Sequence, residues 1–331
     1  MRENRRTWGT GVGLVTAIAT LVVGLVLEAT PADAGTARQG NRVSARWAGA
    51  IDTGNRTAVN TAYWSQYASN QMLPTGWLGG SLVGCLPGLS SLTSNAATLS
   101  ALNYVRSLAG LAPVQMSAEL NQGAQQAALM MSANGALSHD PSSGWKCYSS
   151  AGAQAAHRSN LALAYPSIGS GQIIDLYMDE PGDTNTAVGH RRWLLNPFTT
   201  VVGTGSTNTA NALTVIGPTS KSRPNPKYIG WPTAGYFPNA IEPNGRWSLS
   251  AGRNGTNFSK ARIIVKHAGA RVPVHKYAVH GGYAQPTVVW QMPAGFSTTG
   301  DYRVVVKNIR RSGSHKHFKY AYTVRLFTPT P

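Results

Sequence analysis

Histidine and acidic side chains in the middle third of this 331-residue sequence are the groups that could carry chemistry. His139, His190 and Glu180 supply two imidazoles and a carboxylate, the ligand set of many open zinc sites. A metal-bound water could in principle hydrolyse a bond. The sequence has no HExxH pattern, however, and no GxSxG elbow surrounds Ser159. Spacing alone does not show that these residues meet.

The elements that must position these side chains are predicted to be both helical and extended. Apolar residues at helical spacing predict a helix from residue 95 to a stop at Gly110, and Ser117 starts a second helix that ends at Asn134-Gly135. Further helices are expected over 171–179 and 191–195. Two strands of a hairpin are expected over 200–206 and 212–217. The middle of the chain is therefore of the α+β class.

Four sequence blocks in this region resemble those of bacterial CAP domains, the superfamily of cysteine-rich secretory proteins, antigen 5 and pathogenesis-related proteins. The first block runs from 102 to 140 and includes Leu137-Ser-His139-Asp140. The others are Ser159-Asn-Leu-Ala162, similar to the family's "GENLA", then Tyr177-Met-Asp-Glu180-Pro-Gly182, and Gly189-His190-Arg-Arg-Trp-Leu-Leu-Asn-Pro197. Together, and in this order, the blocks identify residues 95–220 as a CAP/SCP-like domain.

The resemblance implies an α-β-α sandwich with a cleft lined by two histidines and two acids. By motif position these are His139, His190 and Glu180, and Ser159 stands where the second acid would be. Asp140, Asp179 or Asp183 could replace that acid from a neighbouring position. The family also implies a weakly bound divalent metal, zinc or magnesium, held by His139, His190 and Glu180, although no cofactor is required and no catalytic residue is assigned.

The C-terminal residues 221–331 form a different, β-rich part. Strand-like runs occur at 261–267, 286–292, 302–308 and 321–326, with glycine and proline turns between them. This pattern is typical of an all-β, immunoglobulin-like sandwich. Residues 35–94 are expected to be an irregular leader segment before the CAP-like domain.

The first 34 residues predict export. Arg2, Arg5 and Arg6 precede an uncharged apolar run over 11–27 and a small-x-small cleavage pattern at 31–34, the order of a secretory signal peptide. An uncleaved signal anchor is the alternative. Export permits a disulfide between the two cysteines, Cys85 and Cys147. We therefore expect a secreted, extracellular protein. Association with the cell envelope is also compatible with these features.

The net charge of +17 is concentrated at the C-terminal end, where residues 221–331 contain 17 Lys or Arg and two acids. Such a basic part favours anionic partners, either a cell-wall polymer or a membrane surface. A merely solubilising charge is the alternative. No base-reading module is present, so specific nucleic-acid binding is not expected.

Three functions are compatible with these features. The first is a non-enzymatic secreted module whose cleft binds a lipid, another small hydrophobic ligand, a peptide or an envelope partner while the basic part holds an anionic surface. The second is a metal-assisted hydrolase acting on peptide or cell-wall material, which the serine at position 159 disfavours. The third is a structural envelope protein with a vestigial cleft.

Overall fold

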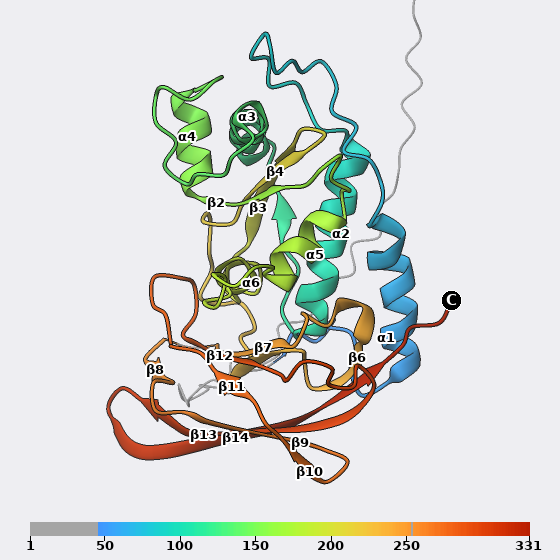
Figure 1. Ribbon diagram of the computed structural model, residues 1–331, viewed down its shortest axis with the longest axis vertical. Helices are drawn as coiled ribbons and strands as arrows, with labels where there is room; N and C mark the ends of the chain where they lie inside the picture. Colours follow the sequence, from blue (N-terminus) through green and yellow to red (C-terminus); the bar gives the residue numbers. More distant parts are fainter. Residues whose placement is uncertain (1–45, 253) are drawn as a thin grey trace, which may run out of the picture. The chain divides into compact units, whose positions relative to one another are not determined.

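The computed structural model describes residues 46–252 and 254–331 (Figure 1). The predicted signal peptide lies outside these residues. Helices occur at α1 (Arg56–Ala62), η1 (Tyr63–Tyr67), η2 (Ala68–Asn70), α2 (Leu92–Leu108), α3 (Ala118–Asn134), α4 (Ser150–His157), α5 (Gln172–Asp179), α6 (Gly189–Leu194) and η3 (Asn239–Ile241). None of the helices in the described ranges is long and apolar enough to cross a membrane.

The strands fall into one group before residue 220 and a second group after it. The first group is β1 (Gln115–Met116), β2 (Ser159–Leu163), β3 (Val201–Ser206) and β4 (Ala210–Thr214). The second is β5 (Tyr228–Trp231), β6 (Gly235–Pro238), β7 (Arg246–Ala251), β8 (Thr256–Asn257), β9 (Arg262–His267), β10 (Ala270–Val272), β11 (His275–Lys276), β12 (Thr287–Gln291), β13 (Gly300–Arg311) and β14 (Ser314–Phe327). The chain is thus mixed helix and sheet.

The first four strands form one sheet in the order β1-β3-β4-β2, with helices on both faces (Figure 1). Successive side chains of β4 point to opposite faces. Ala212 joins the small cluster under α3 and α4, whereas Leu213 joins the larger cluster under α2 and α5. Helix α3 lies very close to β3 at Gly205. A Cβ atom on this glycine would stand 2.1 Å from the backbone nitrogen of Gln125, so the absence of a side chain permits the close approach. The hairpin strands predicted at 200–206 and 212–217 are present as β3 and β4.

Helix α3 begins and ends at the predicted residues, whereas α2 begins at Leu92, three residues before the predicted start at residue 95. Ser91 and Ser117 accept hydrogen bonds from the backbone N–H groups three residues further on, which caps α2 and α3. Gly135 ends α3 in the left-handed conformation with φ 58°. Residues 56–70 differ from the expected irregular leader, since they are helical. Tyr67 packs on Tyr104 of α2 there, with ring centroids 5.1 Å apart.

The C-terminal residues form two further sheets. One has the order β10-β9-β13-β14-β6 with β8 beside β13, and the other has the order β11-β12-β7-β5. The four predicted strands are present as β9, β12, β13 and β14. Aromatic side chains fill the space between the sheets, and the rings of Trp247 and Tyr302 meet edge to face at 5.5 Å. This part of the chain is β-rich, as the sequence predicts.

The helical and β-rich parts share one hydrophobic core. A single cluster of buried side chains includes Leu102 of α2 and Leu194 of α6 together with Trp231 of β5 and Trp290 of β12. The described residues accordingly form one compact unit. The β-rich part is therefore placed firmly enough against the helices to contribute to a site there.

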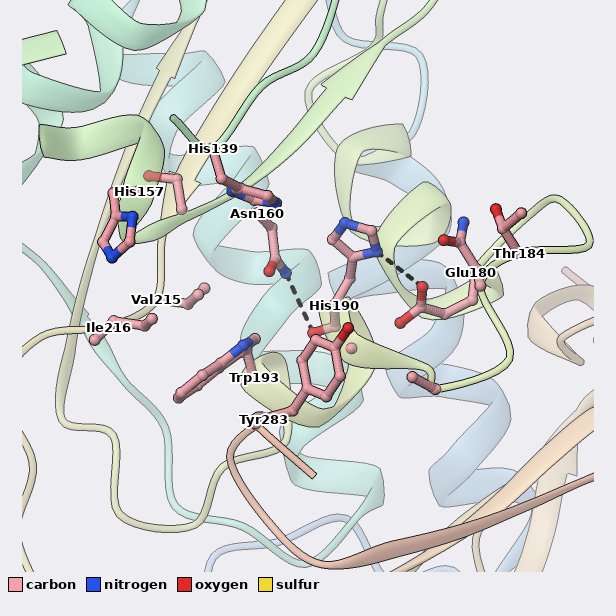
Figure 2. Close-up of a pocket in the computed structure, with 15 residues that line it drawn as sticks. His139, His157, Asn160, Glu180, Thr184, His190, Trp193, Val215, Ile216 and Tyr283 are labelled. Atoms are coloured by element: carbon pink, nitrogen blue, oxygen red, sulfur yellow. Dashed lines mark hydrogen bonds and ion pairs between the residues drawn. The ribbon is translucent and has the colours of Figure 1, made fainter. Parts of the chain in front are cut away.

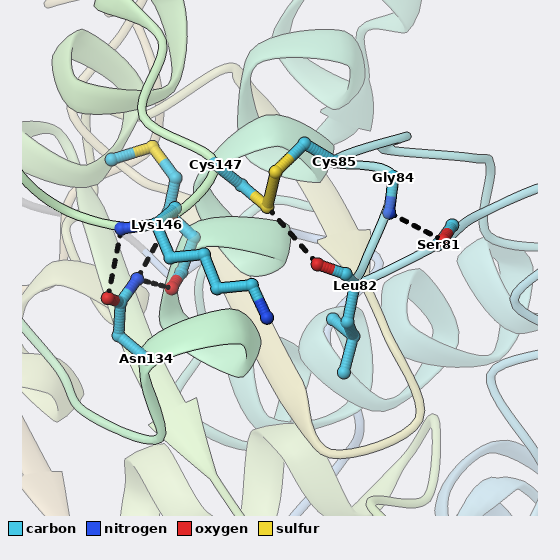
Figure 3. The surroundings of a disulfide bond; sticks show 8 residues. Ser81, Leu82, Gly84, Cys85, Asn134, Lys146 and Cys147 are labelled. Carbon is cyan, nitrogen blue, oxygen red and sulfur yellow. Dashed lines mark hydrogen bonds between the residues drawn. A yellow bond between two sulfur atoms is a disulfide. The ribbon is translucent and has the colours of Figure 1, made fainter.

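The predicted disulfide between Cys85 and Cys147 is confirmed (Figure 3). The two Cα atoms are 4.9 Å apart and 62 residues separate them in the chain. The bond ties the segment before α2 to the segment between α3 and α4. No described cysteine is free.

Candidate functional site

The candidate site is a pocket of about 410 Å³ that contains all four residues singled out in the sequence (Figure 2). His139 lies in the segment after α3, Ser159 begins β2, Glu180 follows α5, and His190 lies in the first turn of α6. Because these elements are far apart in sequence, their convergence depends on the packing of the helices against the sheet. The volume lies within the range of small-molecule sites in proteins.

Glu180 is held at the base of the pocket by backbone geometry and by two hydrogen bonds. It caps α5 in the left-handed conformation, with φ 56°, and it is only 1% exposed. Its Oε2 atom accepts a hydrogen bond from His190, while Oε1 accepts from the backbone N–H of Arg191 at 2.9 Å. Val188, just before α6, also has a positive φ of 46°, which is rare for a β-branched residue. Strained backbone at Glu180 and at Val188, two residues before His190, is a feature often found at functional sites.

His190 is oriented by Glu180. Its Nδ1 atom lies 2.8 Å from Oε2 of Glu180. A carboxylate can only accept, so Nδ1 carries the hydrogen, and in the neutral ring Nε2 presents a lone pair. The ring stacks on Tyr177, with centroids 5.5 Å apart, and Asn160 donates to the His190 backbone carbonyl. Figure 2 shows the second ring nitrogen directed away from Glu180, on the side of His139. His190 is thus a preorganised hydrogen-bond acceptor.

His139 lies on the same side of the pocket, together with a third histidine, His157. Nδ1 of His139 is 3.1 Å from the backbone oxygen of Ala156 and donates to it, which leaves Nε2 as an acceptor. His157 also lines the pocket and pairs with Asp140 through an Nδ1–Oδ1 distance of 2.9 Å. Both partners in that pair are largely exposed. The sequence gives no signal for His157, because it lies outside the matching blocks.

Ser159 occupies the position of the second acid in the family pattern, but it does not take over the chemical role of that acid. Its hydroxyl donates to the backbone oxygen of Ala155 at 2.7 Å and shares a 2.9 Å hydrogen bond with Thr214. The side chain is buried and fully engaged in these contacts. Asp140 and Asp179 have other partners, His157 and Asn244, and among the described residues that line the pocket Glu180 is the one acid.

The pocket residues, as arranged, do not fit a three-ligand metal site. Glu180 uses one oxygen for His190 and the other for a backbone N–H group. The Nε2 atoms of His139 and His190 are then the two groups left that could ligate a metal ion. Within residues 46–252 and 254–331, no group of three His, Cys, Asp or Glu side chains could hold a metal ion.

The opposite wall of the pocket is apolar and includes a residue of the β-rich part. Trp193, Val215 and Ile216 line it together with Tyr283, from the segment between β11 and β12 (Figure 2). An apolar wall facing imidazole and amide groups is suited to a ligand with an apolar body and a polar end. The two parts of the chain therefore build the site jointly.

Arg192 fixes the segment that carries Tyr283. Its guanidinium lies 4.9 Å from the centre of the Tyr283 ring and donates to the backbone oxygens of Gln285 and His280. Burial lowers the pKa of Arg192 to about 10, which the neighbouring Tyr283 partly offsets. The ring also reaches Gly189 so closely that a Cβ atom there would lie 2.5 Å from Cε1 of Tyr283. The sequence carries no signal for this contact, since the glycine looks like an ordinary part of the "GHR" block.

The geometry defines a class of protein with helices on both faces of a small sheet and a histidine–glutamate cleft. Comparison with known families finds that residues 99–216 match the family model of the cysteine-rich secretory protein family, CAP, so the chain contains a CAP domain. All four singled-out residues lie within the matched segment, whereas Tyr283 lies outside it. No curated protein matches the chain.

Proposed function

We propose that this protein is a secreted, non-enzymatic binding module of the cell envelope. The pocket binds a small amphiphile, such as a lipid or an apolar peptide end, and the basic β-rich part holds the molecule at an anionic surface. The observation that carries the proposal is the two-sided pocket, with oriented imidazoles on one wall and Trp193, Ile216 and Tyr283 on the other.

The hydrogen-bonding groups support binding in preference to catalysis. The hydroxyl of Ser159 is engaged by Ala155 and Thr214, so it is not poised as a nucleophile. Nε2 of His190 is free to accept a hydrogen bond from a hydroxyl or amide group of a ligand. A metal-assisted reaction would require Glu180 to leave two existing partners.

A hydrolase is the second candidate function, and one observation favours it. Glu180 orients His190 through Nδ1, as an acid orients a general base in many hydrolases. In that case a water molecule would have to be the nucleophile. The variant His190→Gln separates the two functions. A hydrolase would release product and would lose turnover in this variant, whereas a binding module shows no turnover with or without the substitution.

The distribution of basic side chains supports attachment to a polyanion. Arg262 and Lys266 of β9 and Arg303 and Lys307 of β13 alternate with buried residues, so they share the sheet face that is turned away from the core. The register pairs Lys307 with Arg262 and Arg303 with Lys266, and Arg271 of β10 also lies opposite Lys266. Like charges directly opposite one another are destabilising, and a bound polyanion would relieve this repulsion.

Other features support the remaining parts of the proposal. The Cys85–Cys147 bond suits an oxidising compartment such as the extracellular space. Two facing antiparallel-rich sheets support an immunoglobulin-like sandwich for the C-terminal part, with β14 and β6 as a parallel pair at its edge. No specific nucleic acid is proposed as a partner.

The pocket is tested by titrating the secreted form with a fluorescent fatty-acyl amphiphile and by extracting organic ligands from the purified protein. We expect Tyr283→Ala, which shortens a half-exposed wall residue, to weaken binding about tenfold. Tyr165→Ala is the matched control, because Tyr165 is exposed and lies outside the pocket. Equal affinities of the two variants, or saturable binding by neither, would refute the pocket as the binding site.

The basic face is tested with polyphosphate-coated beads over a range of salt concentrations. Replacing Arg262, Lys266 and Lys307 by Gln should lower the slope of log affinity against log salt by about one per removed cation. The control variant removes the same charge at exposed positions elsewhere, Arg56, Arg158 and Lys221. Equal losses in the two triple variants would show that net charge, and not this face, determines attachment.

A further inference from the structure

The segment between η2 and α2 presents an unusual concentration of exposed aliphatic side chains. We call residues 71–91 the stapled loop, because Cys85 ties it to Cys147 (Figure 3). Val83 is 89% exposed, Leu78 and Leu89 are each 68% exposed, and Leu86 is 55% exposed. In Figure 1 the loop extends from the helical part, at the end opposite the C-terminal sheets. Single exposed leucines are ordinary, but a cluster on one short loop indicates an interaction surface.

The loop lies in a long stretch of sequence without any charge. No Lys, Arg, His, Asp or Glu occurs between Arg56 and Arg106, in a chain whose net charge is +17. A protein partner is usually selected through charged and polar groups around an apolar centre. Charged groups are missing within the loop itself. The loop is therefore better suited to an apolar medium than to the surface of a specific protein partner.

Part of the loop backbone is paired internally, which lowers the cost of entry into lipid. Leu78 and Leu89 exchange two hydrogen bonds of 2.9 Å, and Ser81 and Leu86 exchange two of 2.9 and 3.0 Å. The N–H of Gly84 at the tip donates to the Ser81 hydroxyl. These backbone groups keep their hydrogen bonds when the exposed side chains leave water.

The loop is also fixed before it meets a partner. Trp77 donates through Nε1 to the backbone oxygen of Pro87 at 2.7 Å, and Gln125 of α3 donates to the same oxygen at 2.9 Å. The disulfide adds a third attachment. Preorganisation of this kind lowers the entropic cost of binding.

Residues next to Cys147 complete the pattern of a membrane-interface element. Lys146 and Tyr148 are exposed, and Trp145 is partly buried. Figure 3 shows Lys146 beside the loop, near Leu82. Tyrosine, tryptophan and lysine favour the headgroup layer, where lysine meets lipid phosphate groups. This arrangement provides cationic complementarity at the base of an apolar tip.

We propose that the stapled loop inserts its aliphatic tip into the headgroup–acyl boundary of a lipid bilayer. This anchor is separate from the basic face of the C-terminal sheets, because it depends on apolar burial and not on net charge. Its test therefore uses neutral lipid and high salt, conditions under which the proposed electrostatic attachment is lost.

The test is flotation of the secreted form, from Gly35 onward, with vesicles of pure phosphatidylcholine in 1 M salt, where the Debye length is about 3 Å. We expect the wild type to bind and Val83→Asp to reduce its partition coefficient about tenfold, with a further loss when Leu86→Asp is added. Val279→Asp is the matched control, since Val279 is an exposed valine outside the loop, 36% exposed, and should bind as the wild type does.

Several outcomes would overturn the proposal. These are wild-type protein that stays unbound, a Val83→Asp variant that binds as well as the wild type, and equal losses in Val83→Asp and Val279→Asp. Self-association that Val83→Asp abolishes, without any vesicle binding, would assign the loop to a second copy of the chain. Val83→Ser provides the same test without a new charge, and thermal unfolding of each variant verifies the fold.

Discussion

Arg191 offers a test of how the helical and β-rich parts are joined. Its side chain is buried, and its Nε donates to the backbone oxygen of Met178 at 2.8 Å. Nη1 crosses to β7, where it donates to the backbone oxygen of Arg246 at 2.7 Å and to the hydroxyl of Ser248 at 3.1 Å. The planar guanidinium thus connects the end of α5 to a C-terminal strand. We compare its replacement by Met and by Lys.

The two replacements differ in whether they keep the buried charge. Burial, partly offset by the nearby carboxylates, lowers the pKa of Arg191 to about 10, which corresponds to a net cost of the buried charge of roughly 3 kcal/mol. Arg191→Met leaves three acceptors unpaired, at about 1 kcal/mol each, but it also removes that cost. The net change should be within about 1 kcal/mol, as for other buried charges replaced by apolar residues. Arg191→Lys keeps a more strongly hydrated charge and loses at least two hydrogen bonds, so it should destabilise by about 3 kcal/mol.

Urea unfolding followed by tryptophan fluorescence measures both values, with Arg303→Met as the control because Arg303 is exposed on the outer sheet face. We expect the order wild type, Met, Lys in decreasing stability, and a difference of about 2 kcal/mol between Met and Lys. The deficit of the lysine variant should shrink at alkaline pH, because the unfolded chain holds the lysine proton to higher pH than the buried site does. A lysine variant more stable than the methionine variant would refute the reasoning, since Arg191 would then act through its charge alone.

Three further predictions concern a carboxyl group, a close contact and the disulfide. Burial raises the pKa of Glu242 above its ordinary 4.5, so the contribution of this group to native stability falls as the pH rises from about 4 to 7. The variant Glu242→Gln should therefore gain more free energy of unfolding, relative to the wild type, at pH 7 than at pH 4. Urea unfolding at the two pH values measures this difference. Gly189→Ala should push Tyr283 out of the pocket wall and weaken the fluorescent amphiphile about as much as Tyr283→Ala, with little change in melting temperature. Replacing Cys85 and Cys147 by Ser should lower the free energy of unfolding by about 4 kcal/mol. A loss below about 1 kcal/mol would contradict the view that the disulfide stabilises the fold by restricting the conformations of the unfolded chain.

Local signals account for the elements that could be predicted from the sequence. The apolar spacing of α2 and the serine and glycine that bound α3 predict those helices, and alternating apolar runs predict β9, β12, β13 and β14. Helix α4 could not be predicted, because Ser150–His157 contains small residues without an apolar stripe. It is helical because Ser149 caps it and because Ala155 and Ala156 pack against α3 and the sheet.

The site was predictable where a family pattern covers it and unpredictable elsewhere. His139, Ser159, Glu180 and His190 were identified by resemblance, and the structure brings them to one pocket. Their hydrogen-bond partners were not predictable, because they depend on distances that sequence spacing does not contain. Tyr283 is the clearest omission, since it reaches the pocket only through the packing of residues that are distant in the chain.

The shared core makes the pocket a property of the whole unit and not of the CAP-matching segment alone. Leu102 and Leu194 are buried together with Trp231 and Trp290, so a chain ending near residue 220 would expose apolar surface on α2 and α6. The same truncation would remove Tyr283 and the carbonyl groups of Gln285 and His280, which are hydrogen-bond acceptors of Arg192. A ligand that contacts Tyr283 must therefore stabilise the contact between both parts. If the pocket binds a ligand as proposed, binding would be linked to the stability of the unit that carries the basic face.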